Sequence, residues 1–229
     1  MRATSAAGSS AATTALRGLD AEMGRVLEFL DESGLAENTI VVFTADHGDL
    51  HGSHNLTRKG KPEDESLHIP LMVRWPKRVA SAKLDTLATS IDLMPTLIAM
   101  AGLPVPDRCE GRDLSAALVQ GHPPQVDSVY TQGAMTTAKG QWRALVTPTH
   151  KLALYGNGET PKLFNLEKDP YEMTNLAGTR EHAALEKELR AQLMSKAKQT
   201  GDPFPAAAQK AKVLYSDEEA KRAQGRAGA

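Results

Sequence analysis

A loop that follows an apolar run carries an acid and a histidine side by side. Asp46, His47 and Gly48 follow five consecutive β-forming residues, Ile40 to Thr44, after a single alanine. A carboxylate supplies a hard oxygen and an imidazole a borderline nitrogen, and two such neighbours suit a divalent cation. They form only part of a shell, which takes roughly four to seven donors. The alternative is a plain turn, in which Asp46 caps backbone amides and hydrogen bonds hold His47.

Further polar side chains lie on the same stretch. Lys59 stands thirteen residues after Asp46 and is followed by Gly60. A lysine beside a metal can neutralise an anionic ester and its leaving oxygen. The same region holds three more potential proton donors, although a single histidine is more often a surface residue. They are His51, His54 and His68. Together these residues favour a metal-assisted site over a plain turn.

Such a site needs elements that bring the loop to the edge of a sheet. The run from Ile40 to Thr44 reads as a buried strand of a parallel sheet, and ligands gather beyond the carboxyl ends of such strands. Apolar residues at helical spacing predict a helix that begins at Leu16 and stops before Gly34. Residues 69–75 predict a second strand. Helix, turn and apolar strand are typical of a doubly wound α/β sheet.

The pattern changes near residue 105. Just before it, Asp92 and Pro95 begin another helix, which ends at Gly102. Short alternating runs then predict a small antiparallel sheet, followed by an amphipathic helix. The runs are 141–147, 151–155 and 162–166, with a hairpin loop at 156–158 and the helix over 181–198.

The chain therefore divides into four segments. Residues 1–15 are expected to be a disordered leader, because they hold small polar residues and no apolar run. Residues 16–104 form the α/β part, and residues 105–198 a small α+β subdomain. Residues 199–229, rich in alanine and mixed charge, are expected to be a tail.

Composition excludes several classes of protein. The 229 residues are 41% hydrophobic and 24% charged, with a net charge of −1, so the chain can bury a core and has no basic stripe for nucleic acid. No run reaches the roughly 18 apolar residues of a membrane span, and the start has no apolar signal-peptide core. The compartment stays undefined. The single cysteine, Cys109, excludes an internal disulfide.

Four blocks between Gly18 and Gly178 follow one another in a specific order. They read GLDAEMGRVLEFLDESGLAENTIVVFTADHG, RKGKPEDESLHIPLMVRWP, SIDLMPTLIAMAGL and LFNLEKDPYEMTNLAG. In this joint order the chain resembles the carboxyl-terminal part of a sulfatase of the alkaline phosphatase superfamily. The resemblance implies part of that superfamily's doubly wound α/β sheet, followed by a small antiparallel sheet with a C-terminal helix. ADHG alone is weak, because phosphomutases of the superfamily carry it too.

The resemblance also assigns roles to residues. Asp46 and His47 match the family's second pair of metal ligands, in the subgroup that has His where others have Asn. Lys59 matches the lysine that contacts the sulfate, and His54 matches a position near the mouth of the substrate site. His68 departs from the arginine usual before the Ile-Pro-Leu strand. The metal that the resemblance implies is Ca²⁺, with Mn²⁺ or Zn²⁺ as alternatives because His47 offers an imidazole nitrogen.

The family's nucleophile has no counterpart in this chain. Sulfatases hydrolyse sulfate esters with a formylglycine made in a C/S-x-P/A-x-R motif. Cys109 opens CEGRD, which has glycine at the third place and arginine at the fourth and so fails the motif. TTALR, which begins at Thr13, matches the spacing but follows no acidic pair. The family's first aspartate ligands are missing as well. The sequence thus predicts a truncated or split sulfatase, whose partner is the missing catalytic half with its formylglycine, and whose substrate is a sulfate ester such as an aryl sulfate or a sulfated glycan.

Two other functions remain open. A phosphonate or phosphate ester hydrolase of the same superfamily is favoured by His47 in place of Asn. A domain that binds a partner or a glycan without turnover is favoured by the absent nucleophile, but the joint presence of Asp46, His47 and Lys59 argues against it. In each case, apolar edges left without neighbours predict self-association of the isolated chain.

Overall fold

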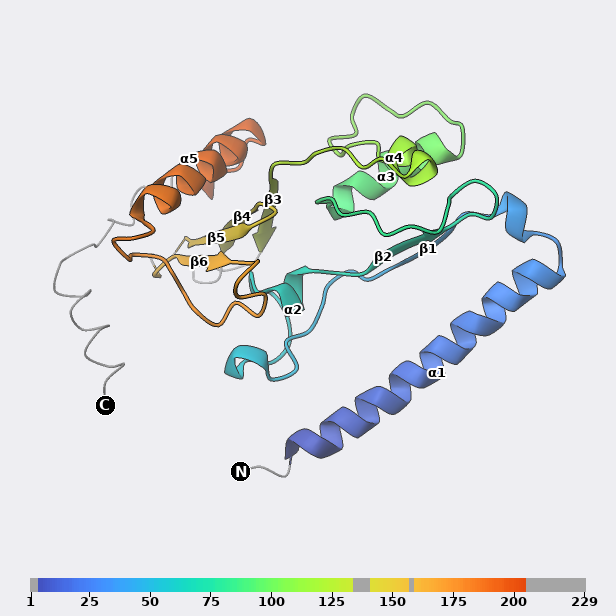
Figure 1. Ribbon diagram of the computed structural model, residues 1–229, viewed down its shortest axis with the longest axis horizontal. Helices are drawn as coiled ribbons and strands as arrows, with labels where there is room; N and C mark the ends of the chain where they lie inside the picture. The colour runs from blue at the N-terminus through green and yellow to red at the C-terminus, as the bar shows by residue number, and fades with distance from the viewer. Residues whose placement is uncertain (1–3, 134–140, 157–158, 205–229) are drawn as a thin grey trace.

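The computed structural model describes residues 4–133, 141–156 and 159–204, which form two antiparallel sheets with helices around them (Figure 1). The helical elements are α1 (Thr4–Glu32), η1 (Ala36–Asn38), η2 (Ser53–Asn55), α2 (Asp64–Leu67), η3 (Ser90–Asp92), α3 (Leu93–Met100), α4 (Ser115–Gln120) and α5 (Ala183–Gln199). The strands are β1 (Val41–Thr44), β2 (Leu71–Arg74), β3 (Val129–Gly133), β4 (Trp142–Val146), β5 (His150–Tyr155) and β6 (Lys162–Asn165).

Helix α1 extends along one side of the molecule, away from both sheets (Figure 1). It ends as predicted, because Gly34 takes a positive φ of 72° and the Leu35 N–H donates to the Leu30 carbonyl at 3.0 Å. It begins at Thr4, however, well before Leu16. The disordered leader expected over residues 1–15 is therefore not found over residues 4–15, where frequent alanine favours a helix.

Strands β1 and β2 pair with each other in antiparallel register, with Val42 opposite Val73. Both strands were predicted, but the parallel pairing expected for the Ile40–Thr44 run is wrong within the described residues, and β1 is half-buried rather than buried. An apolar run predicts that a strand is shielded from solvent, but it does not predict whether the neighbouring strand is parallel or antiparallel.

The four-stranded sheet has the order β3-β4-β5-β6, each strand antiparallel to the next. The runs predicted for β4, β5 and β6 are confirmed, and β3 was missed. Helix α5 lies on one face of this sheet (Figure 1) and closes the main core. That core consists of Leu145, Leu152, Leu154, Leu163, Leu189, Leu193 and Phe204. Of the expected hairpin loop, residues 157–158 lie outside the described part of the chain.

The tail expected from residue 199 begins later. Phe204 is 1% exposed in the core, and Asp202 accepts a hydrogen bond from Arg143 Nε at 2.6 Å. A single aromatic residue after a charged helix gave no periodic signal, so the sequence placed it in the tail. Residues 205–229 lie outside the described residues.

Helix α3 is entered through a capping box in which Asp92 accepts the Thr89 N–H at 2.9 Å. The same carboxylate binds Arg112 at 2.6 Å, which ties the loop before α4 to the start of α3. Helix α3 ends at Met100, and Gly102, whose φ is 74°, follows two residues later. The helix predicted from Asp92 and Pro95 is confirmed.

Candidate functional site

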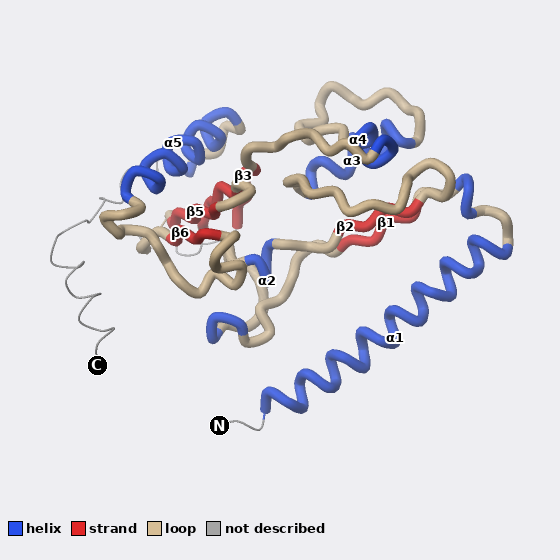
Figure 2. Tube along the Cα trace, in the orientation of Figure 1, coloured by secondary structure: helices blue, strands red, loops and turns tan. Residues whose placement is uncertain are grey.

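The predicted site residues all lie on the long connection between β1 and β2. Figure 2 shows this connection leaving β1, passing through η2, and reaching α2 beside the four-stranded sheet before it returns as β2. The loop is therefore held at two places: at the strand ends and against the C-terminal sheet.

Asp46 and His47 turn toward each other just beyond the end of β1. Oδ1 of Asp46 accepts the backbone N–H of His47 at 3.0 Å, and Oδ2 lies 3.3 Å from Nε2 of the ring. On the other side of the ring, Nδ1 donates to the Gly48 carbonyl at 2.7 Å. Because that bond requires a proton on Nδ1, the neutral ring keeps its lone pair on Nε2.

Lys59 reaches the same point from the far side of the loop. Its ammonium group donates a hydrogen bond to Nε2 of His47. The Asp46 side chain is 86% exposed and that of His47 is 36% exposed, so the group opens to solvent. The structure thus brings together Asp46, His47 and Lys59.

Close backbone packing explains why the loop adopts this course. A Cβ at position 48 would lie 2.0 Å from the carbonyl oxygen of Glu65, so only glycine fits there. The Gly48 N–H donates to the Ser66 carbonyl at 3.0 Å, and the Gly60 N–H donates to Ser66 Oγ at 2.9 Å. The buried Ser66 thereby joins the segment of His47 to the segment of Lys59.

The other histidines do not join this group. His54 Nε2 lies 3.2 Å from Oε2 of Glu65, and its side chain is 14% exposed. His51 pairs with Asp49 at 3.4 Å. A hydrogen bond to Asp64 raises the pKa of His68 above its ordinary value, against the opposing effect of burial. Each of these three histidines contacts a carboxylate of its own, and the partly buried pair of His54 and Glu65 is the one at the predicted place near the substrate.

The donor set fits part of a divalent-cation shell. Two ligand atoms at right angles on one ion, with bonds of about 2.1–2.4 Å, lie roughly 3.0–3.4 Å apart. Asp46 Oδ2 and His47 Nε2 have such a separation, 3.3 Å. No group of three or more His, Cys, Asp or Glu side chains gathers for a metal anywhere in the described ranges. The described residues therefore offer two candidate donor atoms at this point, fewer than a complete shell has.

Comparison with known proteins decides the family. The family model described as N-sulphoglucosamine sulphohydrolase, C-terminal, matches residues 52–199. The chain belongs to the sulfatase family, in the alkaline phosphatase superfamily. It is similar to an arylsulfatase of Clostridium perfringens, with 33% identity over 72% of this chain and 34% of that protein. It is also similar to an ulvan-active sulfatase of Formosa agariphila, with 31% identity over 81% of this chain and 38% of that protein.

Solved structures agree. A structure described as bound to its substrate D-glucosamine-2-N,6-O-disulfate superposes with a TM-score of 0.76 and 28% identity, over 82% of this sulfatase chain and 40% of that chain. A phosphonate monoester hydrolase of Agrobacterium radiobacter superposes with a TM-score of 0.71 and 26% identity, over 79% of this chain and 39% of that chain. The predicted alkaline phosphatase-like α/β fold is thus confirmed. This chain spans about a third to two fifths of the length of these relatives.

The near-matches to the sulfatase nucleophile motif have structural roles here. Cys109 is half-buried in a turn, where its N–H donates to the Pro106 carbonyl at 2.9 Å. Arg112 of the same CEGRD stretch binds Asp92 at 2.6 Å. Thr13 of TTALR lies within α1, on an exposed face. No helix in the part of the chain that the structure describes is both long and apolar enough to cross a membrane.

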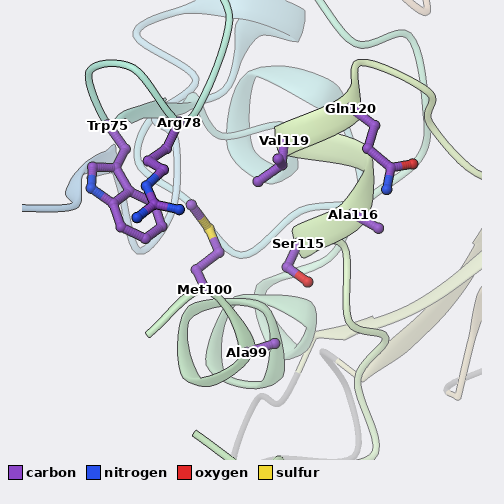
Figure 3. A pocket seen from close by; sticks show the side chains of 8 residues that line it. All are labelled: Trp75, Arg78, Ala99, Met100, Ser115, Ala116, Val119 and Gln120. Atoms are coloured by element: carbon purple, nitrogen blue, oxygen red, sulfur yellow. The ribbon is translucent and has the colours of Figure 1, made fainter. Parts of the chain in front are cut away.

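A separate shallow pocket of about 300 Å³ lies beside α3 and α4 (Figure 3). Arg78 stacks over Trp75, with its guanidinium carbon 5.6 Å from the ring centre, and Met100 reaches toward them from α3. None of the predicted site residues lines the pocket.

Sequence reasoning missed the residues that support the loop from below. Trp142 of β4 donates from its indole nitrogen to the Gly60 carbonyl at 2.9 Å. Lys151 of β5 is fully buried and forms an ion pair with Asp64 at the start of α2. Both residues were recognised only as members of strands, because their long-range partners leave no local pattern. A lysine in an otherwise apolar strand was the one available signal.

Proposed function

We propose that this chain provides the carboxyl-terminal part of the active site of a sulfuric ester hydrolase. Asp46 and His47 would hold a divalent cation, and Lys59 would contact the sulfate group. The observation that carries the proposal is the meeting of these three side chains at one exposed point. Membership of the sulfatase family supports it. The nucleophile and the remaining ligands would come from residues outside this chain, so the chain alone would be inactive.

Each of the three residues has a distinct task. The Gly48 carbonyl fixes the ring of His47, so that Nε2 presents a lone pair. The Asp46 carboxylate brings negative charge to the same side of the ring. Lys59 supplies a positive charge, which lowers the energy of negative charge that develops on a sulfate oxygen. A bound cation would add Lewis-acid stabilisation of that charge.

His54 is proposed as a proton donor at the mouth of the site. Its ring shares a 3.2 Å contact with Glu65, and both side chains are largely sheltered. A carboxylate partner stabilises the protonated ring, which could then give its proton to a departing alcohol. Gly48 packs against the backbone of Glu65, so this pair sits close to the main group.

For the cation we propose Ca²⁺, because the family implies it, with Mn²⁺ or Zn²⁺ as the alternative. Calcium is bound almost wholly by oxygen atoms, whereas His47 offers nitrogen. For the substrate we propose an aryl sulfate or a sulfated glycan. The neighbour solved with D-glucosamine-2-N,6-O-disulfate supports the glycan.

A phosphonate ester hydrolase is the second candidate. The similarity to the phosphonate monoester hydrolase of Agrobacterium radiobacter, at a TM-score of 0.71, supports it. The imidazole of His47 in place of an amide supports it as well. The two candidates are distinguished by assaying an aryl sulfate and phenyl phosphonate side by side on a protein in which this chain is joined to a catalytic half. The ester with the larger kcat/KM identifies the activity.

The test is to join this chain to the amino-terminal part of the Clostridium perfringens arylsulfatase and to measure hydrolysis of an aryl sulfate. We expect turnover by the joined protein and none by the chain alone. Lys59→Ala should lower kcat by about 10² to 10³. Lys61→Ala, which removes an exposed lysine of the same loop, should change kcat little. Turnover by the isolated chain at enzymatic rates would contradict the shared site, as would equal effects of the two substitutions.

A further inference from the structure

The block LFNLEKDPYEMTNLAG contains a buried acid that the proposed chemistry does not use. Glu172 is 2% exposed and takes a left-handed φ of 54°. Its Oε2 accepts the backbone N–H of Asp64 at 2.7 Å, across 108 residues of sequence. Glu172 therefore caps the start of α2, which belongs to the loop that carries Lys59.

The turn around Glu172 is held from both sides. Oδ2 of Asp169 accepts the Thr174 N–H at 2.7 Å, and Oδ1 of Asn175 accepts the Leu163 N–H at 2.9 Å. The Glu172 N–H itself donates to the Asp169 carbonyl at 3.0 Å. These hydrogen bonds hold the backbone of the turn in which Glu172 lies.

Lys151 completes a buried charge cluster beneath α2. Its ammonium group donates to the Pro62 carbonyl at 3.0 Å, pairs with Asp64, and lies 2.7 Å from Oε1 of Glu172. Lys151 and the Glu172 side chain are both 0% exposed. Beside them, Lys162 of β6 pairs with the buried Glu63. Lysines from β5 and β6 of the four-stranded sheet therefore bind three consecutive residues of the loop, 62–64.

A short series of contacts joins this cluster to the proposed site. Asp64 begins α2, which contains Ser66. The carbonyl and hydroxyl of Ser66 accept the N–H groups of Gly48 and Gly60, at 3.0 Å and 2.9 Å. Those glycines are the immediate neighbours of His47 and Lys59. A shift of α2 would therefore move both site residues.

We propose that Lys151 and Glu172 are positioning residues, whose buried ion pair holds the loop so that Lys59 and His47 meet. The catalytic importance of the contact between Lys59 and His47 rests on the proposed function, but the positioning of the two side chains by the ion pair does not. Burial raises the pKa of Glu172, against the opposing charge of Lys151, so the carboxylate depends on the lysine to stay ionised. Removal of Lys151 leaves the buried carboxylate of Glu172 and the partly buried one of Asp64 without their shared cation, and a buried charge without a partner is strongly destabilising.

The test compares two buried cations of the same sheet in the purified chain. Lys151→Met removes the cation that faces the loop. Arg143→Met removes one that faces Asp202, away from the loop, where the guanidinium pairs at 2.6 Å. Amide hydrogen exchange at Gly48 and Gly60 reports the loop, and exchange in β4 and β5 reports the sheet. The nitrogen shifts of the neutral His47 ring report whether Nδ1 keeps its proton.

We expect Lys151→Met to speed exchange at Gly48 and Gly60 at least about tenfold relative to β4 and β5, and to shift the His47 proton from Nδ1 toward Nε2. Arg143→Met should either speed hydrogen exchange in the sheet and the loop by the same factor or leave both exchange rates unchanged. If Lys151→Met does not fold, the near-isosteric Glu172→Gln should give the same pattern with a smaller ratio. The proposal would be overturned if the ratio of loop exchange to sheet exchange stayed at its wild-type value in the folded Lys151→Met and Glu172→Gln variants. It would also be overturned if Arg143→Met raised this ratio as much as Lys151→Met does. The readout involves no turnover, so an inactive joined enzyme leaves it intact.

Discussion

The ammonium group of Lys59 donates to Nε2 of His47 across twelve residues of sequence. A neutral imidazole has one free lone pair, so this nitrogen can bind either the ammonium or a cation, not both at once. Binding of a metal would release Lys59 toward solvent, where a sulfate oxygen could meet it. The two roles predicted for these residues are therefore coupled.

That coupling predicts that Lys59→Ala tightens cation binding by the isolated chain. The substitution frees the lone pair and removes a nearby positive charge, so the Kd for Mn²⁺ should fall several-fold. Lys61→Ala, which removes a charge of the same loop, should have a smaller effect. Titration calorimetry or Mn²⁺ relaxation measures both. Equal Kd values for wild type and Lys59→Ala would show that the lysine does not occupy the ligand nitrogen.

Gly48→Ala should open the loop. The new methyl group would lie 2.0 Å from the Glu65 carbonyl oxygen, and backbone must move to admit it. We expect a loss of about 1–3 kcal/mol in the free energy of unfolding, measured with urea. Gly24→Ala is the control, since nothing lies within 4 Å of that position in α1, and it should stabilise the chain. A neutral Gly48→Ala variant would refute the close approach of the two segments.

Acid should weaken the attachment of α2 to the C-terminal sheet. Burial raises the pKa of Asp64, but hydrogen bonds and charge from His68 and Lys151 outweigh it and lower the pKa from 3.8 to about 2. The ionised form is thus favoured by folding, and its contribution is complete above about pH 4 and is lost as the pH falls to about 2. Asp64→Asn should remove the part of the acid sensitivity that falls in this window. Urea titrations from pH 5 to pH 2 measure it.

His68 acts with the opposite sign. Its pKa is raised by the hydrogen bond to Asp64, so its contribution is present below pH 6.5 and is lost as the pH rises through the higher folded value. The side chain is 78% exposed, so solvent screens this contribution. Stability of this region should therefore be greatest between about pH 4 and pH 6.5.

The isolated chain should self-associate through α1. Four large apolar side chains of this helix are more than half exposed: Leu16, Leu19, Val26 and Phe29. Helical spacing puts them on one side, and a contiguous apolar surface drives association. The double substitution Leu19→Lys and Val26→Lys should give a monomer in sedimentation velocity experiments. The control Glu28→Lys, on the opposite side of the helix, should leave the chain associated. A sharp monomer peak with cooperative melting for the wild type would contradict this expectation.

Local patterns predicted the elements that local chemistry determines. Alternation found β4, β5 and β6, helical spacing with Gly34 found the end of α1, and Asp92 with Pro95 found the start of α3. The grouping of Asp46 with His47 followed from adjacency, and the meeting with Lys59 was inferred from the chemistry of the loop. In each case neighbouring residues carried the signal.

Features set by distant partners could not be predicted. The antiparallel neighbour of β1 is thirty residues away, and Phe204 enters a core made by other elements. The partners of Glu172 and Lys151 lie far away in the sequence, and only the fold brings both side chains to the start of α2. The start of α1 was misplaced for another reason: small polar residues mixed with alanine fit a leader and a helix about equally.

The most direct test of the proposed ion site is paramagnetic broadening by Mn²⁺ in the isolated chain. We predict that the ring signals of His47 and the amide of Asp46 broaden first, with a Kd of about millimolar because only two ligands are present. Asp46→Ala should abolish this while it changes stability little, since the side chain is 86% exposed. The control Asp49→Ala, three residues further along the chain, should leave the broadening at His47 unchanged. Broadening that Asp46→Ala leaves unchanged, or that centres on other carboxylates, would contradict the claim that Asp46 and His47 form half of a metal site.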